Sequence, residues 1–123
     1  MSKLSRKELR ARDQWVRKHT GIEFMQCFVV FMACAVVTKN KSTIKSTEIV
    51  EELCTLDPWM FETFDNGAPI SVYKLALILE VFEIKKQPIC FESGTENGYY
   101  CDDIKLISDN YLKIANNLLN KSL

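Results

Sequence analysis

The spacing of apolar residues predicts helices over most of this chain, interrupted by one hairpin near residues 84–101. The first predicted helix, from about Arg6 to His19, carries many basic residues and few apolar ones. It cannot bury much surface by itself and is expected on the outside of the domain. Ser5 and Glu8 have the spacing of a capping box, in which the serine caps the helix and the glutamate reaches back to the serine amide.

The segment from Phe24 to Val37, after a break at Gly21, is apolar almost all round. A helix of this kind is expected in the centre of a domain. Its valines also suit a β-strand, but a run of this length favours a helix. The unbroken apolar stretch within it, residues 27–37, is much shorter than the roughly 18 to 20 residues needed to cross a bilayer. A buried helix is therefore predicted.

A second core helix is predicted after a short extended piece around Ile44. Ser46 is expected to cap this helix, which runs to about Leu56. Ile49 and Leu53 lie four residues apart and are expected to face inward.

A turn-rich loop follows, because Asp57 and Pro58 end the second core helix. The loop contains several aromatic residues. Trp59, Phe61 and Phe64 are expected to pin it to the core.

A third helix is predicted after Ser71, which is expected to cap it. Its inward positions repeat at helical spacing. They are Leu75, Ile78, Leu79 and Phe82, and the expected outward positions are Tyr73, Lys74, Leu77, Glu80 and Val81.

The predicted hairpin has a first strand from Ile84 to Phe91, a turn over S-G-T-E-N-G, and a returning strand from Tyr99 to Cys101. Asp102 is expected to cap a final helix. The apolar stripe of that helix consists of Ile104, Ile107, Tyr111, Ile114 and Leu118.

The order of these elements is the core of a winged helix-turn-helix, since the third helix is followed directly by a hairpin. The predicted fold class is α+β: a winged helix-turn-helix with an extra basic N-terminal helix and a C-terminal helix. A chain of 123 residues has the common size of a single domain. Residues 1–21 are expected to form the basic extension and residues 22–120 the winged-helix domain.

An ordered set of landmarks runs from Ile44 to Leu112: I-K-S-T-E-I-V-E-E-L-C, P-W, N-G-A-P-I-S, L-A-L-I-L-E-V-F-E-I, N-G-Y-Y-C-D-D-I and Y-L. In this order and spacing they resemble a family of unknown function found at the carboxyl end of primase and helicase-like proteins of phages, plasmids and other mobile elements. The resemblance implies a winged-helix module and a mobile-element context. The sequence has no G-x-x-x-x-G-K-[ST] loop, so the ATPase parts of the larger family proteins are absent from it.

The sequence departs from the family pattern at two places. Where the family tends to have Gly-Lys-Pro, this chain has Gly67, Ala68 and Pro69. Where the family tends to have Lys-Gly-Tyr followed by basic residues, this chain has N-G-Y-Y-C. Since Lys and Arg supply most of the non-specific affinity for DNA, these losses weaken the inference of DNA binding.

The charge is distributed unevenly, although the formal net charge is zero. Residues 1–45 carry ten Lys or Arg and three Asp or Glu, and residues 46–123 carry six and thirteen, so the two parts have charges of +7 and −7. A basic segment joined to an acidic body can bind an anionic polymer, dock on its own domain, or pair with a second copy about a two-fold axis. Formation of a homodimer is therefore one of the alternatives.

The candidate nucleic-acid contacts are basic residues of the first helix, of the segment before the second core helix, of the third helix and of the start of the wing. The basic residues of the first helix are candidates for one cationic rim with Lys39, Lys41 and Lys45 and with Lys85 and Lys86. Such a rim suits phosphate or single-stranded nucleic acid, with Trp15 as a stacking face. The predicted nucleic-acid partner is single- or double-stranded DNA. Base readout from the third helix has only Lys74 to offer. The full set is Arg6, Lys7, Arg10, Arg12, Arg17, Lys18, Lys41, Lys45, Lys74, Lys85 and Lys86.

A protein partner is the alternative, because Tyr73, Leu77 and Val81 form an apolar stripe at fourfold spacing on the expected outward face of the third helix. This stripe is a candidate protein interface. The competing interpretation is that the basic first helix or the aromatic loop covers the stripe within the monomer.

Catalysis, metal binding and cofactor binding have little support in the sequence. His19 is the only histidine and lies in a basic stretch, as a surface histidine would. The five cysteines include no C-x-x-C pair and are expected to be reduced core thiols, although Cys90 and Cys101 flank the wing turn and could approach each other. Asp102 and Asp103 are explained by capping and the helix dipole. The N-terminus does not resemble a secretory signal, so a cytoplasmic protein that avoids membranes is expected.

These observations favour a small non-enzymatic protein of a phage or mobile element that binds nucleic acid as an accessory or regulatory factor. The alternative is a winged-helix module that binds, and possibly inhibits, a host or element protein such as a defence complex. The missing cations and the acidic second part of the chain favour this alternative.

Overall fold

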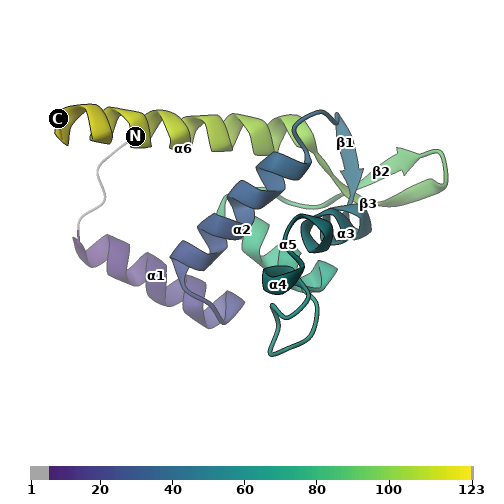
Figure 1. The fold of residues 1–123 in the computed structure, drawn as a ribbon, viewed down its shortest axis with the longest axis horizontal. Coiled ribbons are helices and arrows are strands. Elements are labelled where there is room, and N and C mark those ends of the chain that lie inside the picture. The colour runs from purple at the N-terminus through teal and green to yellow at the C-terminus, as the bar shows by residue number, and fades with distance from the viewer. Residues whose placement is uncertain (1–5, 123) are drawn as a thin grey trace.

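A computed structural model describes residues 6–122, and the side chains of residues 6–9, 12, 119, 121 and 122 lie outside this description. The described chain forms six helices and one small antiparallel sheet of three strands, which confirms a mixed α+β fold (Figure 1). Ser5 and the side chain of Glu8, the predicted capping box, are not described. The elements are α1 (Arg6–Thr20), α2 (Phe24–Val37), β1 (Thr43–Lys45), α3 (Ser46–Leu56), α4 (Pro58–Phe61), α5 (Val72–Val81), β2 (Gln87–Phe91), β3 (Gly94–Tyr100) and α6 (Cys101–Ser122).

Helix α2 has the predicted bounds but is buried along one face only. Val30 and Phe31 are inaccessible to solvent, whereas Met25 and Val36 on the opposite face are 64% and 61% exposed. The helices that pack against α2, which are α1, α3, α5 and α6, leave this second face open. The predicted central position is therefore right for one face of α2 and wrong for the other.

The sheet has the strand order β1-β3-β2, with both pairs antiparallel. The predicted turn of the hairpin is wrong: β3 begins at Gly94, and the loop consists of Glu92 and Ser93. The Asn97-Gly98 pair resembles a turn signal in the sequence but lies inside β3. Gly98 is needed there because a Cβ atom at this position would lie 2.5 Å from the carbonyl oxygen of Ile44 on β1.

The predicted first strand also begins too early, because the turn that ends α5 includes its first residue, Ile84. Glu83 adopts the left-handed conformation, with φ of 62°. Its N–H donates to the Glu80 carbonyl at 3.0 Å, and the N–H of Ile84 donates to the Leu79 carbonyl at 3.1 Å. This is a Schellman motif, which usually has a glycine at the position of Glu83. Ile84 is buried beneath the motif, and β2 starts three residues later.

The core combines the inward faces of the helices with the sheet, and most of the predicted inward residues are buried. Leu75, Ile78, Leu79 and Phe82 of the third predicted helix are all buried, as are Ile49 and Leu53 of α3. Phe82 stacks on Phe31, with ring centroids 4.4 Å apart, and Tyr111 of α6 meets Phe82 edge-on at 5.8 Å. The aromatic contact between Tyr111 and the α2–α5 pair fixes the first half of α6 to the domain.

Three local predictions about the loop and the caps are corrected. Trp59 is 89% exposed, so it does not pin the loop, whereas Phe61 is buried and Phe64 half-buried, as predicted. Ser46 is the first residue of α3 and its side chain does not cap the helix; the capping position is Lys45. Asp102 is not a cap either, because α6 begins one residue earlier and Asp102 lies in its first turn.

Candidate functional site

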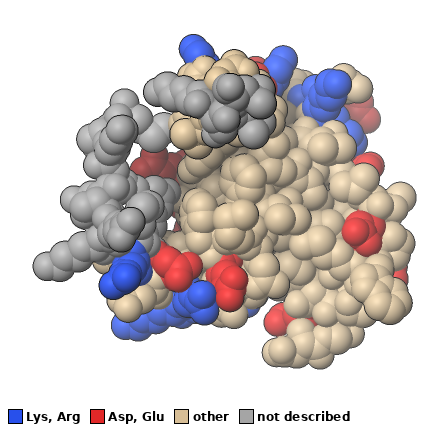
Figure 2. Space-filling model, turned by 60° about the vertical axis from the view of Figure 1, so that its left-hand side comes forward, with Lys and Arg blue, Asp and Glu red and all other residues tan. Residues whose placement is uncertain are grey.

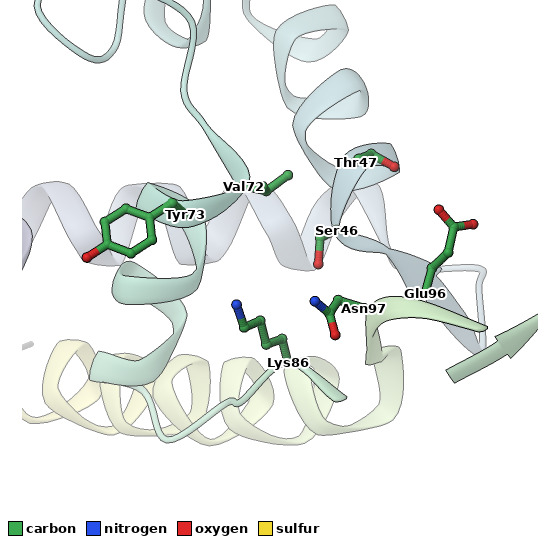
Figure 3. Close-up of a pocket in the computed structure, with 7 residues that line it drawn as sticks. All are labelled: Ser46, Thr47, Val72, Tyr73, Lys86, Glu96 and Asn97. Carbon is green, nitrogen blue, oxygen red and sulfur yellow. The ribbon is translucent and has the colours of Figure 1, made fainter. Parts of the chain in front are cut away.

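A pocket lies where the first turns of α3 and α5 meet the beginning of the hairpin. Its volume is about 340 Å³, and Figure 3 shows the side chains that line it. They are Ser46 and Thr47 of α3, Val72 and Tyr73 of α5, Lys86 before β2, and Glu96 and Asn97 of β3.

Strand pairing brings these three segments together. Lys45, the residue before α3, pairs with Gly98 of β3, and Gln87 of β2 pairs with the same Gly98 from the other side. Asn97 therefore lies beside the start of α3, and Lys86 lies beside Asn97. Since Gly98 is at the centre of both pairs, its close contact with β1 sets the position of the pocket.

The pocket faces two helix amino ends, where the first backbone N–H groups have no partner within the helix. At α5 the Ser71 hydroxyl accepts a hydrogen bond from the N–H of Lys74 at 3.0 Å, as predicted for this cap. At α3 the capping residue, Lys45, provides no side-chain acceptor. The first turn of α3 is thus the less satisfied of the two.

Two buried hydroxyl groups lie beneath α3. Ser46 is 7% exposed and Tyr99 is 1% exposed, and neither hydroxyl forms a hydrogen bond of normal geometry within the described chain. Burial raises the pKa of Tyr99 to about 12, while its interaction with Ser46 acts in the opposite direction. This mutual pairing offsets part of the cost of about 1–3 kcal/mol that an unsatisfied buried group carries.

The carboxylate of Glu96 is neutralised within the hairpin. Lys45 Nζ lies 2.9 Å from Glu96 Oε2, and the Ser93 hydroxyl donates to the same oxygen at 2.8 Å. The hydrogen bond from Lys45 has the largest effect on the pKa of Glu96 and lowers it. The hydrogen bond from Ser93 lowers this pKa further. Lys45 also lies over the ring of Phe91, 5.5 Å from its centroid. Lys45 is therefore engaged inside the protein and is a poor candidate for contacting a ligand.

Two other predicted nucleic-acid contacts are also paired with carboxylates. Arg17 contacts Asp13 at 2.9 Å and Glu23 at 3.3 Å, which raises the pKa of Arg17. Lys41 contacts two glutamates of α3 at 3.7 and 3.9 Å.

Four predicted cations are exposed and form no ion pair with another described side chain. These are Arg10 and Lys18 on α1, and Lys85 and Lys86 before β2. Lys74 is half-buried at the junction of α1 and α5, where its Nζ atom approaches Gly21. The side chains of Arg6, Lys7 and Arg12 lie outside the described part.

The predicted single cationic rim is not formed. Figure 1 places α1 and the β2–β3 hairpin at opposite ends of the molecule. Trp15 on α1 is 47% exposed and stacks on His19 with ring centroids 4.2 Å apart, so one of its faces is already occupied. The basic residues of α1 and those of the hairpin are therefore separate groups.

The predicted protein-binding stripe on α5 is exposed at one end only. Tyr73 is 70% exposed, Leu77 is half-buried, and Val81 is 6% exposed. The prediction for Val81 is wrong, because the last turn of α5 is buried in the core. Packing of α1 against α5 agrees in part with the interpretation that the first helix covers this face.

Uncharged residues cover the middle of the surface seen in Figure 2, with several Asp and Glu among them and Lys and Arg toward the edges. The exposed apolar residues include Met25 and Val29 on α2, and Leu112 and Ile114 on α6.

The one histidine of the sequence lies on the surface of α1. His19 is exposed, as predicted, and its Nδ1 atom lies 2.8 Å from the backbone oxygen of Trp15. The side chains described include no cluster of three or more His, Cys, Asp or Glu suited to a metal ion.

The five cysteines are free, as predicted, but they are not all core residues. Cys90 is exposed, which corrects the prediction for it. It pairs with Thr95 across the hairpin, whereas Cys101 begins α6, so the two thiols are not opposite one another. Burial raises the pKa of Cys34 to about 12, as expected of an inert core thiol.

In residues 6–122 no single helix has both the length and the apolar character needed to cross a membrane. The pair Asp13–Thr20 and Phe24–Val37 would have both only if taken together, and it is bent by 71°.

Comparison with known proteins gives no relative. No protein-family model matches the chain, no curated protein matches it, and no solved structure matches it. The resemblance to the mobile-element family therefore stays a prediction from the sequence landmarks.

Proposed function

We propose that this protein is a non-enzymatic winged-helix protein that binds nucleic acid through α5 and the β2–β3 hairpin. The observation that carries the proposal is the order α2, β1, α3, α5, β2, β3 combined with the strand order β1-β3-β2. In a winged helix-turn-helix these positions are those of the three helices, the short first strand and the wing. The short α4 lies in the connection between the second and third helices.

The position of the unpaired cations supports the hairpin as the contact. Lys85 and Lys86 are exposed just before β2, and Lys86 lines the same pocket as Val72 and Tyr73 of the first turn of α5. Phosphate contacts of this kind give affinity that falls as salt rises. The sequence landmarks add the context of a phage or mobile element, in which such a protein would be an accessory or regulatory factor.

The first test is the binding of labelled single-stranded and duplex DNA by fluorescence anisotropy over a range of salt concentrations. We expect micromolar binding at low salt that weakens steeply as salt rises. Lys85→Gln with Lys86→Gln should weaken binding and reduce the salt slope by about 1 to 2, because each duplex phosphate contact contributes roughly 0.9.

The matched control is the double variant Arg10→Gln with Lys18→Gln on α1, which removes the same charge from the other end of the molecule. Equal losses in both double variants would mean that net charge alone attracts the DNA. Absence of binding at low salt would reject the proposed function.

A second candidate function is protein binding, favoured by the exposed aromatic residues near α5. Tyr73 is 70% exposed and Trp59 is 89% exposed. A module that binds a host or element protein would use Tyr73 at the first turn of α5 as an anchor. In co-purification from cells that carry the element, a specific partner should be lost with Tyr73→Ala. Retention of the same proteins by this variant would reject Tyr73 as the contact.

A further inference from the structure

We infer that the open face of α2 binds the same face of a second copy of this chain, so that two α2 helices pair antiparallel about a two-fold axis. The face is an apolar stripe that consists of Met25, Val29, Met32 and Val36. Met25, Val29 and Val36 are 64%, 47% and 61% exposed, and Met32 is half-buried. Contiguous exposed apolar residues mark an interaction surface. The inference does not depend on the proposed binding of nucleic acid.

The stripe has the spacing of a helix that pairs with another helix. Its residues follow one another at intervals of four, three and four, which is the pattern of a coiled-coil seam. The whole of α2, Phe24–Val37, contains no Lys, Arg, Asp or Glu. The opposite face of the helix, with Val30 and Phe31, is already buried in the domain. The stripe is therefore a second apolar face, in addition to the one that the core uses.

The order of large and small residues makes the stripe complementary to itself. In an antiparallel pair with its axis midway between residues 29 and 32, Met25 lies opposite Val36 of the second copy, and Val29 lies opposite Met32 of the second copy. Every layer then contains one long, flexible side chain and one short, branched side chain, which fill the space evenly. A parallel pair would place Met against Met and Val against Val. The size pattern thus favours two identical copies in the antiparallel arrangement.

The charges at the ends of the stripe fit the same arrangement. Lys39 lies three residues beyond Val36, is exposed, and forms no ion pair with another described side chain. The two-fold axis brings Lys39 level with Ile22 of the second copy and next to its Glu23. The Glu23 side chain is 57% exposed, although it contacts Arg17 at 3.3 Å. By symmetry, the attraction between Lys39 and Glu23 occurs at both ends of the pair.

Helix α6 borders the stripe and adds apolar surface beside it. A pocket of about 280 Å³ between α2 and α6 is lined by Met32, Val36 and Leu112, among others, and Leu112 is 49% exposed. The seam itself is short, because a helix of 14 residues is about 21 Å long. Interfaces below about 1,200 Å² are typically weak, so we expect a dissociation constant in roughly the micromolar range.

The experiment is sedimentation equilibrium of the whole chain from about 1 µM to about 500 µM, a range that brackets this affinity. We expect a reversible dimer. Val29→Glu should weaken it more than about tenfold, because it buries an unpaired charge in a central layer. Leu106→Glu is the matched control, since Leu106 is 63% exposed on α6 outside the stripe. It should change the dissociation constant less than about twofold.

Circular dichroism shows whether each variant is folded. A chain that stays monomeric over the whole concentration range would overturn the inference. A dimer that Val29→Glu leaves intact, or that both variants weaken equally, would also overturn it.

A compensating pair of substitutions tests the match of sizes without adding charge. Val29→Met places two methionines in each central layer, and Met32→Val places two valines there. Each alone should weaken the dimer about threefold or more, through overpacking or a cavity. The combination restores one Met and one Val in each layer and should recover the affinity of the wild type. If the combination is as weak as the single variants, the pairing of α2 with itself is rejected.

Lys39→Glu tests the direction of the pair. In the antiparallel arrangement it places two carboxylates side by side and should weaken the dimer about two- to fivefold at low salt. In a parallel pair Lys39 would lie beside Lys39 of the second copy, and the substitution would leave the affinity unchanged. Lys85→Glu makes the same change of charge at an exposed lysine outside the stripe and is the control. Equal affinities of the Lys39→Glu and Lys85→Glu proteins would overturn the antiparallel arrangement.

Discussion

Tyr99 shows how one residue of the core can govern the response of this protein to pH. Its hydroxyl is buried, and burial raises its pKa from 10.0 to about 12, while the hydrogen bond with Ser46 lowers it. The unfolded chain loses this proton near pH 10, whereas the folded chain keeps it until about pH 12. The stability present below pH 10 is therefore lost as the pH rises through this interval.

Replacing Tyr99 by phenylalanine should remove part of this dependence on pH. We expect Tyr99→Phe to change stability little near neutral pH, because the hydroxyl that it removes is buried and its interaction with Ser46 is weak. Between about pH 10 and pH 12 it should lose roughly 2 kcal/mol less stability than the wild type does. Cys34, whose pKa is also raised to about 12, keeps part of the dependence in the variant. Urea denaturation at several pH values measures the difference, and identical alkaline losses in the two proteins would contradict the argument.

The exposure and pairing of a single side chain were predictable from the sequence only where its neighbours in the sequence determine them. The exposed His19 follows from its basic surroundings. The exposure of Trp59 and of Cys90 does not, because it depends on which elements pack over the loop and over the hairpin. The pairing of Lys45 with Glu96 likewise joins residues that are 51 positions apart in the chain.

At the scale of elements, the two serines near helix starts have opposite environments. The Ser71 hydroxyl caps α5 by accepting a bond from the N–H of Lys74. Ser46 lies inside the first turn of α3, and its buried hydroxyl interacts with the buried hydroxyl of Tyr99 and does not cap the helix. The sequence predicts a cap at both serines, because each precedes a segment with the apolar spacing of a helix.

The matched substitutions Ser71→Ala and Ser46→Ala distinguish these environments. Ser71→Ala should lower the free energy of unfolding by about 1 kcal/mol, as the loss of a cap does. Ser46→Ala removes no cap, so its smaller effect should come only from the lost interaction between the Ser46 and Tyr99 hydroxyl groups. Chemical denaturation of the two variants compares them directly. A larger loss for Ser46→Ala would show that its hydroxyl is satisfied in solution.

The helices were predicted better than the hairpin. Apolar spacing gives the bounds of α1 and α2 closely, since it reports the buried face of a helix. The hairpin turn was misplaced because Asn97-Gly98 has the composition of a turn. Here Gly98 allows β3 to pack closely against β1. A glycine in the sequence does not by itself distinguish a hairpin turn from a close contact between strands. The end of α5 was missed because a glutamate occupies the position where a Schellman motif usually has glycine.

At the scale of the whole molecule, the buried and half-buried side chains described for α6 all lie in its first half. Ile104 is fully buried and Tyr111 is half-buried, whereas Leu112 is 49% exposed and Ile114 is 38% exposed. The apolar stripe of α6 was predictable, but the extent of the surface beneath it was not. The apolar stripe in the sequence of α6 continues beyond the part of this helix that packs against α2 and α5.

Native-state hydrogen exchange should follow this division. We expect amides near Ile104 to exchange only with global unfolding, and amides of residues 113–117 to exchange orders of magnitude faster. Amides of α3, a helix packed within the domain, serve as the internal reference. Equal protection along α6 would contradict the prediction and would mean that another surface covers the second half of this helix.

The close contact of Gly98 with Ile44 couples the position of the hairpin to that of β1 and the start of α3. A side chain of any size at this position would push β3 away from β1, and the floor of the pocket would open with it. Substitutions in the hairpin should therefore be tolerated at exposed positions such as Glu92 and Thr95, whereas any side chain at position 98 should displace the strand and change the shape of the pocket.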